Sequence, residues 1–384
     1  MQQRKLTVVK KLTDGVKFLM RSNQITTFEG EATAVSSGQV RVNQELLDCK
    51  SLIIATGSAP RHLSLPGFII ARKNGVLVDS TGILSLSQIP RRLVVIGGGV
   101  IGVEFAFLFV ELGVQVTVIE MFDRILSLLD LSISQKMQQI AQNKGIKIFT
   151  SCQVTAIKNH TLLFKNQFNQ LQKVDFDICL EAVGRVPIMT GFESLGLVTD
   201  PKTHAIITNQ YCLTNIPHVY AIGDVNGKKM LAHVASAEAH AAVAHLAVDP
   251  NLTQFKMNYD QMPNAIYTHP EVATVGFNER EVKKQGVDYV TQTFPLTRIG
   301  KALADGETEG FVKIIAGRKY HEVLGVHIVA PTATDMIGEV TTLMVSEGTV
   351  TEIARAVHPH PTISEALFEA AWALERKKTN IPPN

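Results

Sequence analysis

Two stretches of the chain combine residue types and spacings that could do chemistry. In the first, the apolar run Leu93–Ile96 leads into a G-x-G-x-x-G turn at 97–102, an apolar helical stretch and then Glu120. In the second, His360 stands between two prolines shortly before Glu365. The glycine pattern is suited to binding a dinucleotide, and an imidazole beside a carboxylate is suited to moving a proton.

The glycine turn is informative because it lies between an expected strand and an expected helix. Gly97 permits a tight turn, Gly99 lets the backbone approach a pyrophosphate, and Gly102 lets the helix pack closely on the strand. Glu120 closes the next strand, where an acid receives ribose hydroxyls, so the pattern favours NAD over NADP. Arg124 is close enough in sequence to leave that preference open, and a glycine-rich turn of an ordinary α/β unit is the alternative.

The histidine and the glutamate allow two interpretations. Glu365 could fix the imidazole of His360 for proton transfer. Thr362-x-x-Glu365 is also a capping box for the helix that follows, and one carboxylate can serve both purposes. A lone histidine before a helix is more often structural. His358 has no evident partner in the sequence, and His269 looks like part of a turn.

The elements that must position these residues are those of an α/β chain. Val9, Leu12, Val16 and Leu19 recur at helical spacing, which predicts an amphipathic helix at 2–22 packed on a domain; an import presequence is the weaker alternative. The other expected helices lie at 101–112, 132–144 and 234–247, and the strands at 24–28, 31–35, 39–42, 93–96, 115–119, 146–149 and 153–157. Asp224 ends a buried strand before a helix, where an Asp commonly caps the helix or binds a ribityl or ribose hydroxyl; the local sequence favours the cap.

The composition changes near residue 259. Short alternating strands are expected at 272–277, 288–294, 311–315 and 322–328, followed by helices at 331–347 and 363–377. This pattern is typical of an α+β domain of normal size.

Composition and charge exclude several classes of protein. The 384 residues carry 37 Lys and Arg against 35 Asp and Glu, so a strongly basic nucleic-acid binder is excluded. The four cysteines (49, 152, 179 and 212) have no C-x-x-C spacing, which predicts no metal site and fits buried thiols in a reducing compartment.

No membrane span and no signal peptide are expected either. The apolar run from 93 to 119 contains three glycines, Glu104 and Glu111, and is better explained by a buried strand and a packed helix. We expect a cytoplasmic protein, or a mitochondrial one if the source is eukaryotic and a targeting segment precedes residue 1.

Several motifs, in one order along the whole chain, resemble those of the pyridine-nucleotide disulfide oxidoreductases. These flavoproteins pass electrons between NAD(P)H, FAD and a redox-active disulfide, and the motifs are most similar to the dihydrolipoamide dehydrogenase branch. The matching residues are Ala55-Thr56-Gly57-Ser58, G-x-G-x-x-G-x-E at 97–104, Gly184-Arg185-x-Pro187, Ala221-Ile222-Gly223-Asp224, Met230-Leu231-Ala232-His233 and His358-Pro359-His360-Pro361-Thr362-x-Ser364-Glu365.

The resemblance implies a fold as well. A Rossmann-like NAD domain (79–190) would be inserted in a truncated FAD-binding domain (1–78 and 191–258). An α+β dimerisation domain (259–384) would follow.

The resemblance further implies which residues bind cofactors and which do chemistry. The FAD contacts would be Ala32, Thr56, Gly57, Ser58, Asp224, Met230, Leu231, Ala232 and His233. The NAD contacts would be Gly97, Gly98, Gly99, Val100, Ile101, Gly102, Val103, Glu104, Glu120, Val154 and Gly184. His360, oriented by Glu365, would be the acid–base group for a dithiol and would serve the other subunit of a homodimer.

The implied activity is the NAD-linked oxidation of dihydrolipoamide through FAD and a disulfide. The substrate would be carried on the lipoyl domains of a 2-oxo-acid dehydrogenase complex.

The sequence departs from the family at its start. The family begins with a G-x-G-x-x-G of its own and a helix bearing Cys-x4-Cys; these residues contain neither, and 2–22 resembles the helix that follows both. We therefore expect exposed apolar surface, and a chain that is incomplete or inactive as written. The alternatives are a dimeric NAD-binding remnant without activity, or another disulfide reductase of glutathione, mercuric or transhydrogenase type. Glu120 argues against an NADPH user, and the doubled His-Pro favours the lipoamide type.

Overall fold

A computed structural model describes residues 1–247 and 256–378, which form two compact units. Unit 1 comprises residues 1–60, 81–88 and 185–257; unit 2 comprises residues 61–80, 89–184 and 258–384. The four-segment division expected from the sequence stays a prediction.

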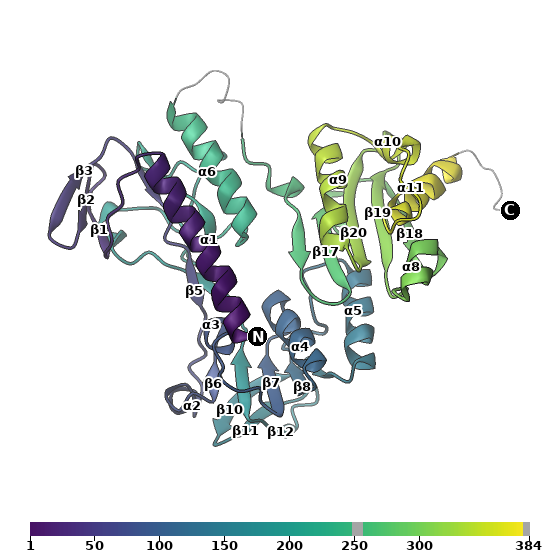
Figure 1. The fold of residues 1–384 in the computed structure, drawn as a ribbon, viewed down its shortest axis with the longest axis horizontal. Coiled ribbons are helices and arrows are strands. Elements are labelled where there is room, and N and C mark those ends of the chain that lie inside the picture. Colours follow the sequence, from purple (N-terminus) through teal and green to yellow (C-terminus); the bar gives the residue numbers. More distant parts are fainter. Residues whose placement is uncertain (248–255, 379–384) are drawn as a thin grey trace. The chain divides into compact units, whose positions relative to one another are not determined.

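Unit 1 is built from short strands and two long helices (Figure 1). An antiparallel sheet contains β1 (Ala32–Ser36), β2 (Gln39–Val42) and β3 (Glu45–Asp48). Two strand pairs accompany it: β4 (Leu52–Ile54) with β15 (Val219–Ala221), parallel, and β5 (Ser58–Pro60) with β14 (Arg185–Pro187), antiparallel. The helices are α1 (Gln2–Ser22), α6 (Ala232–Ala247) and the 3-10 turns η1 (Glu193–Leu195) and η2 (Gly223–Asn226).

The parallel pair β4 and β15 brings distant sequence motifs to one edge. Ile54 lies opposite Ala221, so the residues that follow both strands leave the sheet at the same end. Both residues are buried in a core that also contains Phe192, Ile206 and Val225. Segments 55–58 and 222–224 therefore meet, although they are far apart in the chain.

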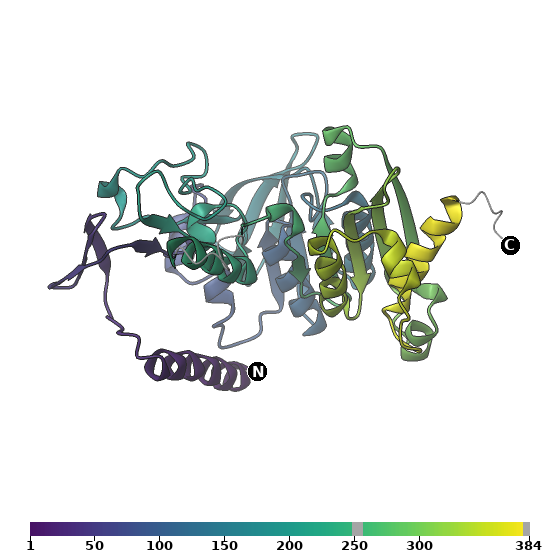
Figure 2. The ribbon, with the colours of Figure 1, turned by 90° about the horizontal axis from the view of Figure 1, so that it is seen from above.

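The helix α1 does not pack as the sequence predicted. It is helical over the expected residues, but none of its side chains is buried, and Leu12 is 66% exposed. Gln2 and Lys5 hold its first turn through the carbonyls of Leu86 and Leu84. In Figure 2 the helix lies apart from the strands of its unit. The apolar stripe is therefore present but has no partner among the described residues.

The first half of unit 2 is a parallel sheet in the order β6-β13-β7-β8-β9. Its strands are β6 (Leu77–Val78), β13 (Ile178–Glu181), β7 (Arg92–Ile96), β8 (Gln115–Ile119) and β9 (Lys147–Phe149). The helices α4 (Val100–Glu111) and α5 (Leu131–Asn143) follow β7 and β8 along the chain. An antiparallel sheet of β10 (Gln153–Lys158), β11 (Thr161–Lys165) and β12 (Leu171–Asp175) shares a core with α2 (Phe68–Lys73). The short helix α3 (Ser80–Ile83) begins at the boundary between the units.

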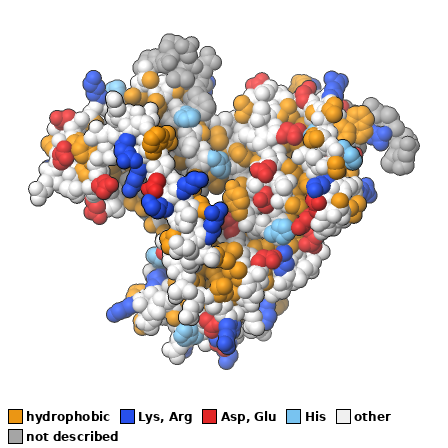
Figure 3. Space-filling model, viewed as in Figure 1, with side chains coloured by type: hydrophobic (Ala, Val, Ile, Leu, Met, Phe, Trp, Pro, Cys, Tyr) orange, Lys and Arg blue, Asp and Glu red, His pale blue; other side chains and the backbone are white. Residues whose placement is uncertain are grey.

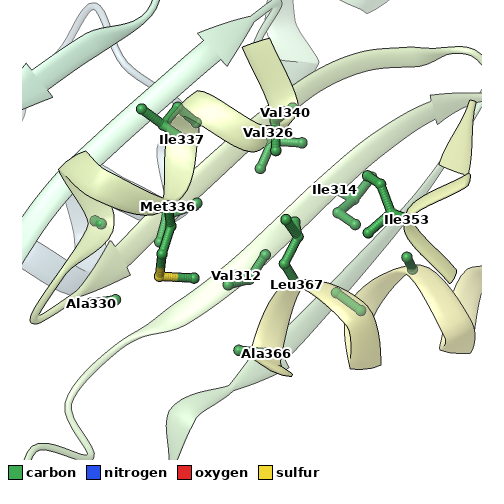
Figure 4. Close-up of a cluster of buried hydrophobic side chains, with 14 of the residues drawn as sticks. Val312, Ile314, Val326, Ala330, Met336, Ile337, Val340, Ile353, Ala366 and Leu367 are labelled. Carbon is green, nitrogen blue, oxygen red and sulfur yellow. The ribbon is translucent and has the colours of Figure 1, made fainter. Parts of the chain in front are cut away.

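The second half of unit 2 is an antiparallel sheet in the order β16-β17-β20-β19-β18. Its strands are β16 (Asn264–Ile266), β17 (Glu271–Gly276), β18 (Tyr289–Pro295), β19 (Phe311–Gly317) and β20 (Val323–Ala330). The helical elements are η3 (Tyr259–Gln261), α7 (Glu279–Gln285), η4 (Leu296–Arg298), α8 (Gly300–Asp305), α9 (Ala333–Val345), α10 (Val350–Arg355) and α11 (Glu365–Lys378). Figure 4 shows the core, where Val312 and Val326 of the sheet meet Ile337, Ile353 and Leu367 of the helices.

The apolar stretch from 93 to 119 is the expected buried strand, packed helix and second strand. Among the described residues, no helix is long and apolar enough to cross a membrane, and no cluster of His, Cys, Asp or Glu could hold a metal ion. On the face drawn in Figure 3, acidic and basic side chains are interspersed. Cys152, Cys179 and Cys212 are buried as expected, whereas Cys49 is half-buried.

Candidate dinucleotide site and histidine–glutamate pair

The glycine turn at the carboxyl end of β7 has the geometry that its sequence predicts. Gly97 has a φ of +104°, and a Cβ there would lie 2.4 Å from the carbonyl oxygen of Ala182. A Cβ on Gly102 would lie 2.0 Å from the carbonyl oxygen of Gly97, so α4 packs directly on the turn. A Cβ on Gly99 would meet no protein atom within 4 Å. Two glycines are therefore required by the fold, whereas Gly99 leaves open space in front of the helix.

The start of α4 offers unused hydrogen-bond donors to that space. Gly99 is the N-cap residue and has no side chain to cap the helix, and Gly99 and Val100 are exposed. The first intrahelical bond comes from the N–H of Val103 to the carbonyl of Gly99. The N–H groups at 100–102, in the first turn of α4, have no intrahelical acceptor and can meet an anion at the positive end of the helix dipole. This arrangement fits a pyrophosphate.

Glu120 follows β8 at the same edge of the sheet and is buried, with 6% of its surface exposed. Its carboxylate accepts hydrogen bonds from the N–H of Gly98 and, at 2.7 Å, from the N–H of Phe122. A Cβ on Gly98 would lie 3.1 Å from Glu120 Oε2. The acid is therefore fixed beside the glycine turn, where the ribose hydroxyls of a dinucleotide would need an acceptor.

The remaining predicted NAD residues lie around this edge. Ile101 and Val103 lie on α4, and Val154 on β10 is half-buried against the core of the parallel sheet. Gly184, with a φ of +110°, comes shortly after β13. Glu104 lies on α4, and its Oε1 accepts the backbone N–H of Tyr267 at 2.9 Å. Burial raises the pKa of Glu104, so its carboxyl group is a weaker acid than an exposed one.

Unit 1 gathers the residues predicted to contact FAD. Thr56 donates to the carbonyl of Ile188 at 2.5 Å, and the hydroxyl of Ser58 donates to the carboxylate of Asp224. Arg185 donates to the hydroxyl and the carbonyl of Ser58, each at 2.6 Å. The prediction that Asp224 caps a helix is wrong: its carboxylate accepts the hydrogen bond from Ser58, and its Oδ2 lies 3.7 Å from Nε of Arg185.

The other predicted FAD residues lie on two elements of the same unit. Met230 and Leu231 are half-buried before α6, and Ala232 and His233 are exposed in its first turn. Ala32 opens β1 and pairs with Val42. Half-buried Gly57, Ser58 and Asp224 at the carboxyl ends of two parallel strands fit a flavin nucleotide, which binds at such edges. The single G-x-G-x-x-G of the 384 residues, however, lies in unit 2.

The structure forms the predicted pair of His360 and Glu365. Nδ1 of His360 lies 2.8 Å from Oε1 of Glu365, and the histidine side chain is 77% exposed. Oε2 of Glu365 accepts the N–H of Thr362 at 2.9 Å. The hydrogen bonds from His360 and from the N–H of Thr362 lower the pKa of Glu365, so it is an anion at neutral pH. One carboxylate thus holds both the ring and the backbone before α11.

The expected capping box is only half formed. The Thr362 hydroxyl donates to the carbonyl of Pro359 at 2.8 Å, and the helix begins at Glu365. His358 does have a partner, Glu339 on α9, whose Oε1 lies 3.1 Å from Nε2 of the ring. Nε2 of His269 lies 3.2 Å from Oε1 of Glu307.

Sequence reasoning missed a buried charge cluster in unit 2. Nζ of Lys313 on β19 lies 2.7 Å from Oδ1 of Asp130 and 2.6 Å from Oε2 of Glu279. Burial alone raises the pKa of Asp130, but hydrogen bonds from Lys313 and Ser132 outweigh it, and the pKa is lowered. A lysine in a strand otherwise made of buried residues was the only sequence signal, and it does not say which acid is the partner.

Comparison with known proteins agrees with these motifs. Residues 2–239 match the family model described as pyridine nucleotide-disulphide oxidoreductase, and residues 262–371 match its dimerisation domain. The chain belongs to this family of oxidoreductases. Members use FAD and NAD(H), and the match to a dimerisation domain supports a homodimer.

Curated relatives in the family cover nearly all of the chain. The dihydrolipoyl dehydrogenase of Mycoplasma pneumoniae is 43% identical over 368 residues, which are 96% of this chain and 79% of the relative. The dihydrolipoyl dehydrogenase of Bacillus subtilis is 37% identical over 396 residues, 98% of this chain and 82% of the relative.

Solved structures show the same fold. LpdA from Mycobacterium tuberculosis has a TM-score of 0.85 at 22% identity, and 97% of this chain aligns with 82% of it. The HOCl-induced flavoprotein disulfide reductase RclA of Escherichia coli has a TM-score of 0.84 at 24% identity, and 97% of this chain aligns with 85% of it.

Proposed function

We propose that the chain supplies the NAD-binding, FAD-binding and acid–base parts of a dihydrolipoyl dehydrogenase acting on lipoyl domains of a 2-oxo-acid dehydrogenase complex. The observation that carries the proposal is the pair of His360 and Glu365 in a member of this family. An imidazole held through Nδ1 keeps Nε2 for a substrate proton, and an exposed ring can reach a thiol on another polypeptide.

The residues at each nucleotide site have separate tasks in this proposal. The donors at the start of α4 and the carboxylate of Glu120 hold NAD, and Thr56, Ser58 and Asp224 hold FAD. When bound, FAD supplies a two-electron relay between the nicotinamide and a disulfide. His360 accepts the thiol proton on Nε2 while Glu365 stabilises the imidazolium that forms.

The 384 residues by themselves do not oxidise dihydrolipoamide in this proposal. The exchange step needs two neighbouring thiols, and no two of the four cysteines have Cys-x4-Cys spacing. Burial raises the pKa of Cys152 and Cys179, which makes their thiolates scarce. The buried thiols favour the second candidate, a dimeric NAD-binding protein without dehydrogenase activity.

Two assays on the purified chain separate these candidates. NADH formation from dihydrolipoamide and NAD, followed at 340 nm with added FAD, is expected to match the blank. A rate above the blank contradicts the proposal that the reaction needs a Cys-x4-Cys pair. NADH-dependent reduction of ferricyanide needs bound flavin but no disulfide, and is expected to be present. If ferricyanide is not reduced while NADH binds, the non-catalytic candidate is the better description.

A further inference from the structure

A buried carboxylate outside the predicted site holds a histidine at the same edge of the parallel sheet. Glu181 is the last residue of β13, has 2% of its surface exposed, and lies opposite Ile96, the residue before the glycine turn. Its Oε2 lies 2.8 Å from Nδ1 of His62, and its Oε1 accepts the N–H of Leu63 at 2.6 Å. Neither residue belongs to the glycine motif.

Arg72 on α2 completes the cluster. Its Nε and Nη2 each lie 3.1 Å from an oxygen of Glu181, and Nη2 also donates to the carbonyl of Leu63 at 2.6 Å. The guanidinium is a permanent charge that neutralises the carboxylate. In the tautomer in which Nδ1–H of His62 donates to Glu181, Nε2 is the acceptor nitrogen of the ring.

The exposure of the two partners differs sharply. The side chain of Glu181 is 1% exposed, whereas that of His62 is 46% exposed. No hydrogen bond to Nε2 of His62 occurs within residues 1–247 and 256–378. The cluster thus fixes an imidazole by one nitrogen and leaves the other available at the surface.

The position of the cluster in the sheet indicates which half of a dinucleotide it would meet. In this sheet Glu120 follows β8, on one side of β7, whereas β13 lies on the other side of β7. A dinucleotide crosses the carboxyl ends of such strands, so its adenosine lies on the side of Glu120 and its nicotinamide half on the side of β13. The N–H of Arg61 donates to the carbonyl of Gly184 at 2.9 Å, which ties the segment bearing His62 to the turn after β13.

We propose that His62, held by Glu181 and Arg72, is a binding residue for the nicotinamide half of NAD. Nε2 accepts a hydrogen bond from a ribose hydroxyl or from the carboxamide N–H of the nicotinamide. Glu181 and Arg72 are positioning residues, because they act only through His62 and its segment. The inference rests on the proposed NAD site at the glycine turn.

The test compares binding of NADH and of ADP by the purified 384-residue chain. ADP has the adenosine and the diphosphate but lacks the nicotinamide half. His62→Ala should weaken NADH binding about threefold to tenfold, the range for loss of one hydrogen bond, and leave ADP affinity unchanged. Because the substitution also removes a partner of buried Glu181, the unchanged ADP affinity shows that the site is still folded. His62→Gln, which keeps an acceptor, should recover part of the loss. The matched control is His160→Ala, on the exposed turn between β10 and β11, which should change neither affinity.

Three results would overturn the proposal, and they are distinguishable. Unchanged NADH affinity in His62→Ala, with binding intact in the wild type, removes the role of His62 alone. Equal losses for NADH and ADP place the effect outside the nicotinamide half. Failure of the wild-type chain to bind either NADH or ADP contradicts the proposed NAD site itself, and this inference with it.

Discussion

The substitution Gly99→Ser separates dinucleotide binding from folding more cleanly than any other change at the turn. Gly99 has φ −74° and ψ −175°, a backbone conformation that serine adopts readily at an N-cap. A Cβ there meets no protein atom within 4 Å, so the fold should tolerate it. Serine is at least as good an N-cap as glycine, and the change in stability should be only a few tenths of a kcal/mol.

The same substitution should impair NADH binding. The new hydroxyl takes one backbone N–H at N2 or N3 of α4 and occupies the space in front of the helix. Loss of one hydrogen bond to a charged phosphate costs about 1.5–3 kcal/mol. This loss corresponds to an increase in Kd of roughly 10-fold to 100-fold. The assay is a titration followed by NADH fluorescence, with Tm measured on the same sample.

Gly102→Ser is the matched control, because its Cβ would lie 2.0 Å from a backbone oxygen that no rotamer change can relieve. It should lower the stability by about 1–3 kcal/mol or more. The reasoning is refuted if Gly99→Ser binds NADH within twofold of the wild type. It is also refuted if Gly99→Ser lowers Tm as much as Gly102→Ser does.

Three further predictions concern charge. Glu120→Gln should reduce the preference for NADH over NADPH about tenfold in paired titrations, since the anion that repels a 2′-phosphate is lost. Lys313→Met should lower the free energy of unfolding by about 3–5 kcal/mol, because it leaves the carboxylate of Asp130 buried without its cation. The control Lys144→Met, which breaks the surface pair with Glu111, should lower it by less than about 1 kcal/mol. Similar losses for the two variants in urea titrations would contradict this. Burial lowers the pKa of His327 to about 4, so on acidification the unfolded chain takes up a proton at this histidine before the folded chain does. The free energy of unfolding should therefore fall by about 2 kcal/mol from pH 8 to pH 5. A His327→Gln variant with the same pH dependence in calorimetry would contradict this.

The parallel half of unit 2 was predictable because each local signal agreed with its neighbours. The glycine turn, the apolar run before it and Glu120 specify strand, helix and strand independently of distant contacts. The observed bounds of the predicted helices and strands in this half differ from the predicted bounds by no more than one residue. His360 and Glu365 were predictable as a pair because they are close in sequence and the last helix begins at Glu365.

Features that depend on distant contacts were not predictable. The strand expected at 24–28 is absent, because it has no partner strand to pair with. The strands β11 and β12, and the helices α2 and α10, were missed because they are short and weakly periodic. Asp224 resembles a helix cap in sequence, and only the pairing of β4 with β15 brings it to Ser58.

Direct binding of nicotinamide dinucleotides to the purified chain tests the central claim. Calorimetric titration with NADH and with NADPH, at one salt concentration, measures stoichiometry and preference together. The account predicts one saturable NADH site per chain and a weaker response to NADPH, because Glu120 lies at the turn. Absence of NADH binding, or tighter binding of NADPH, would contradict it.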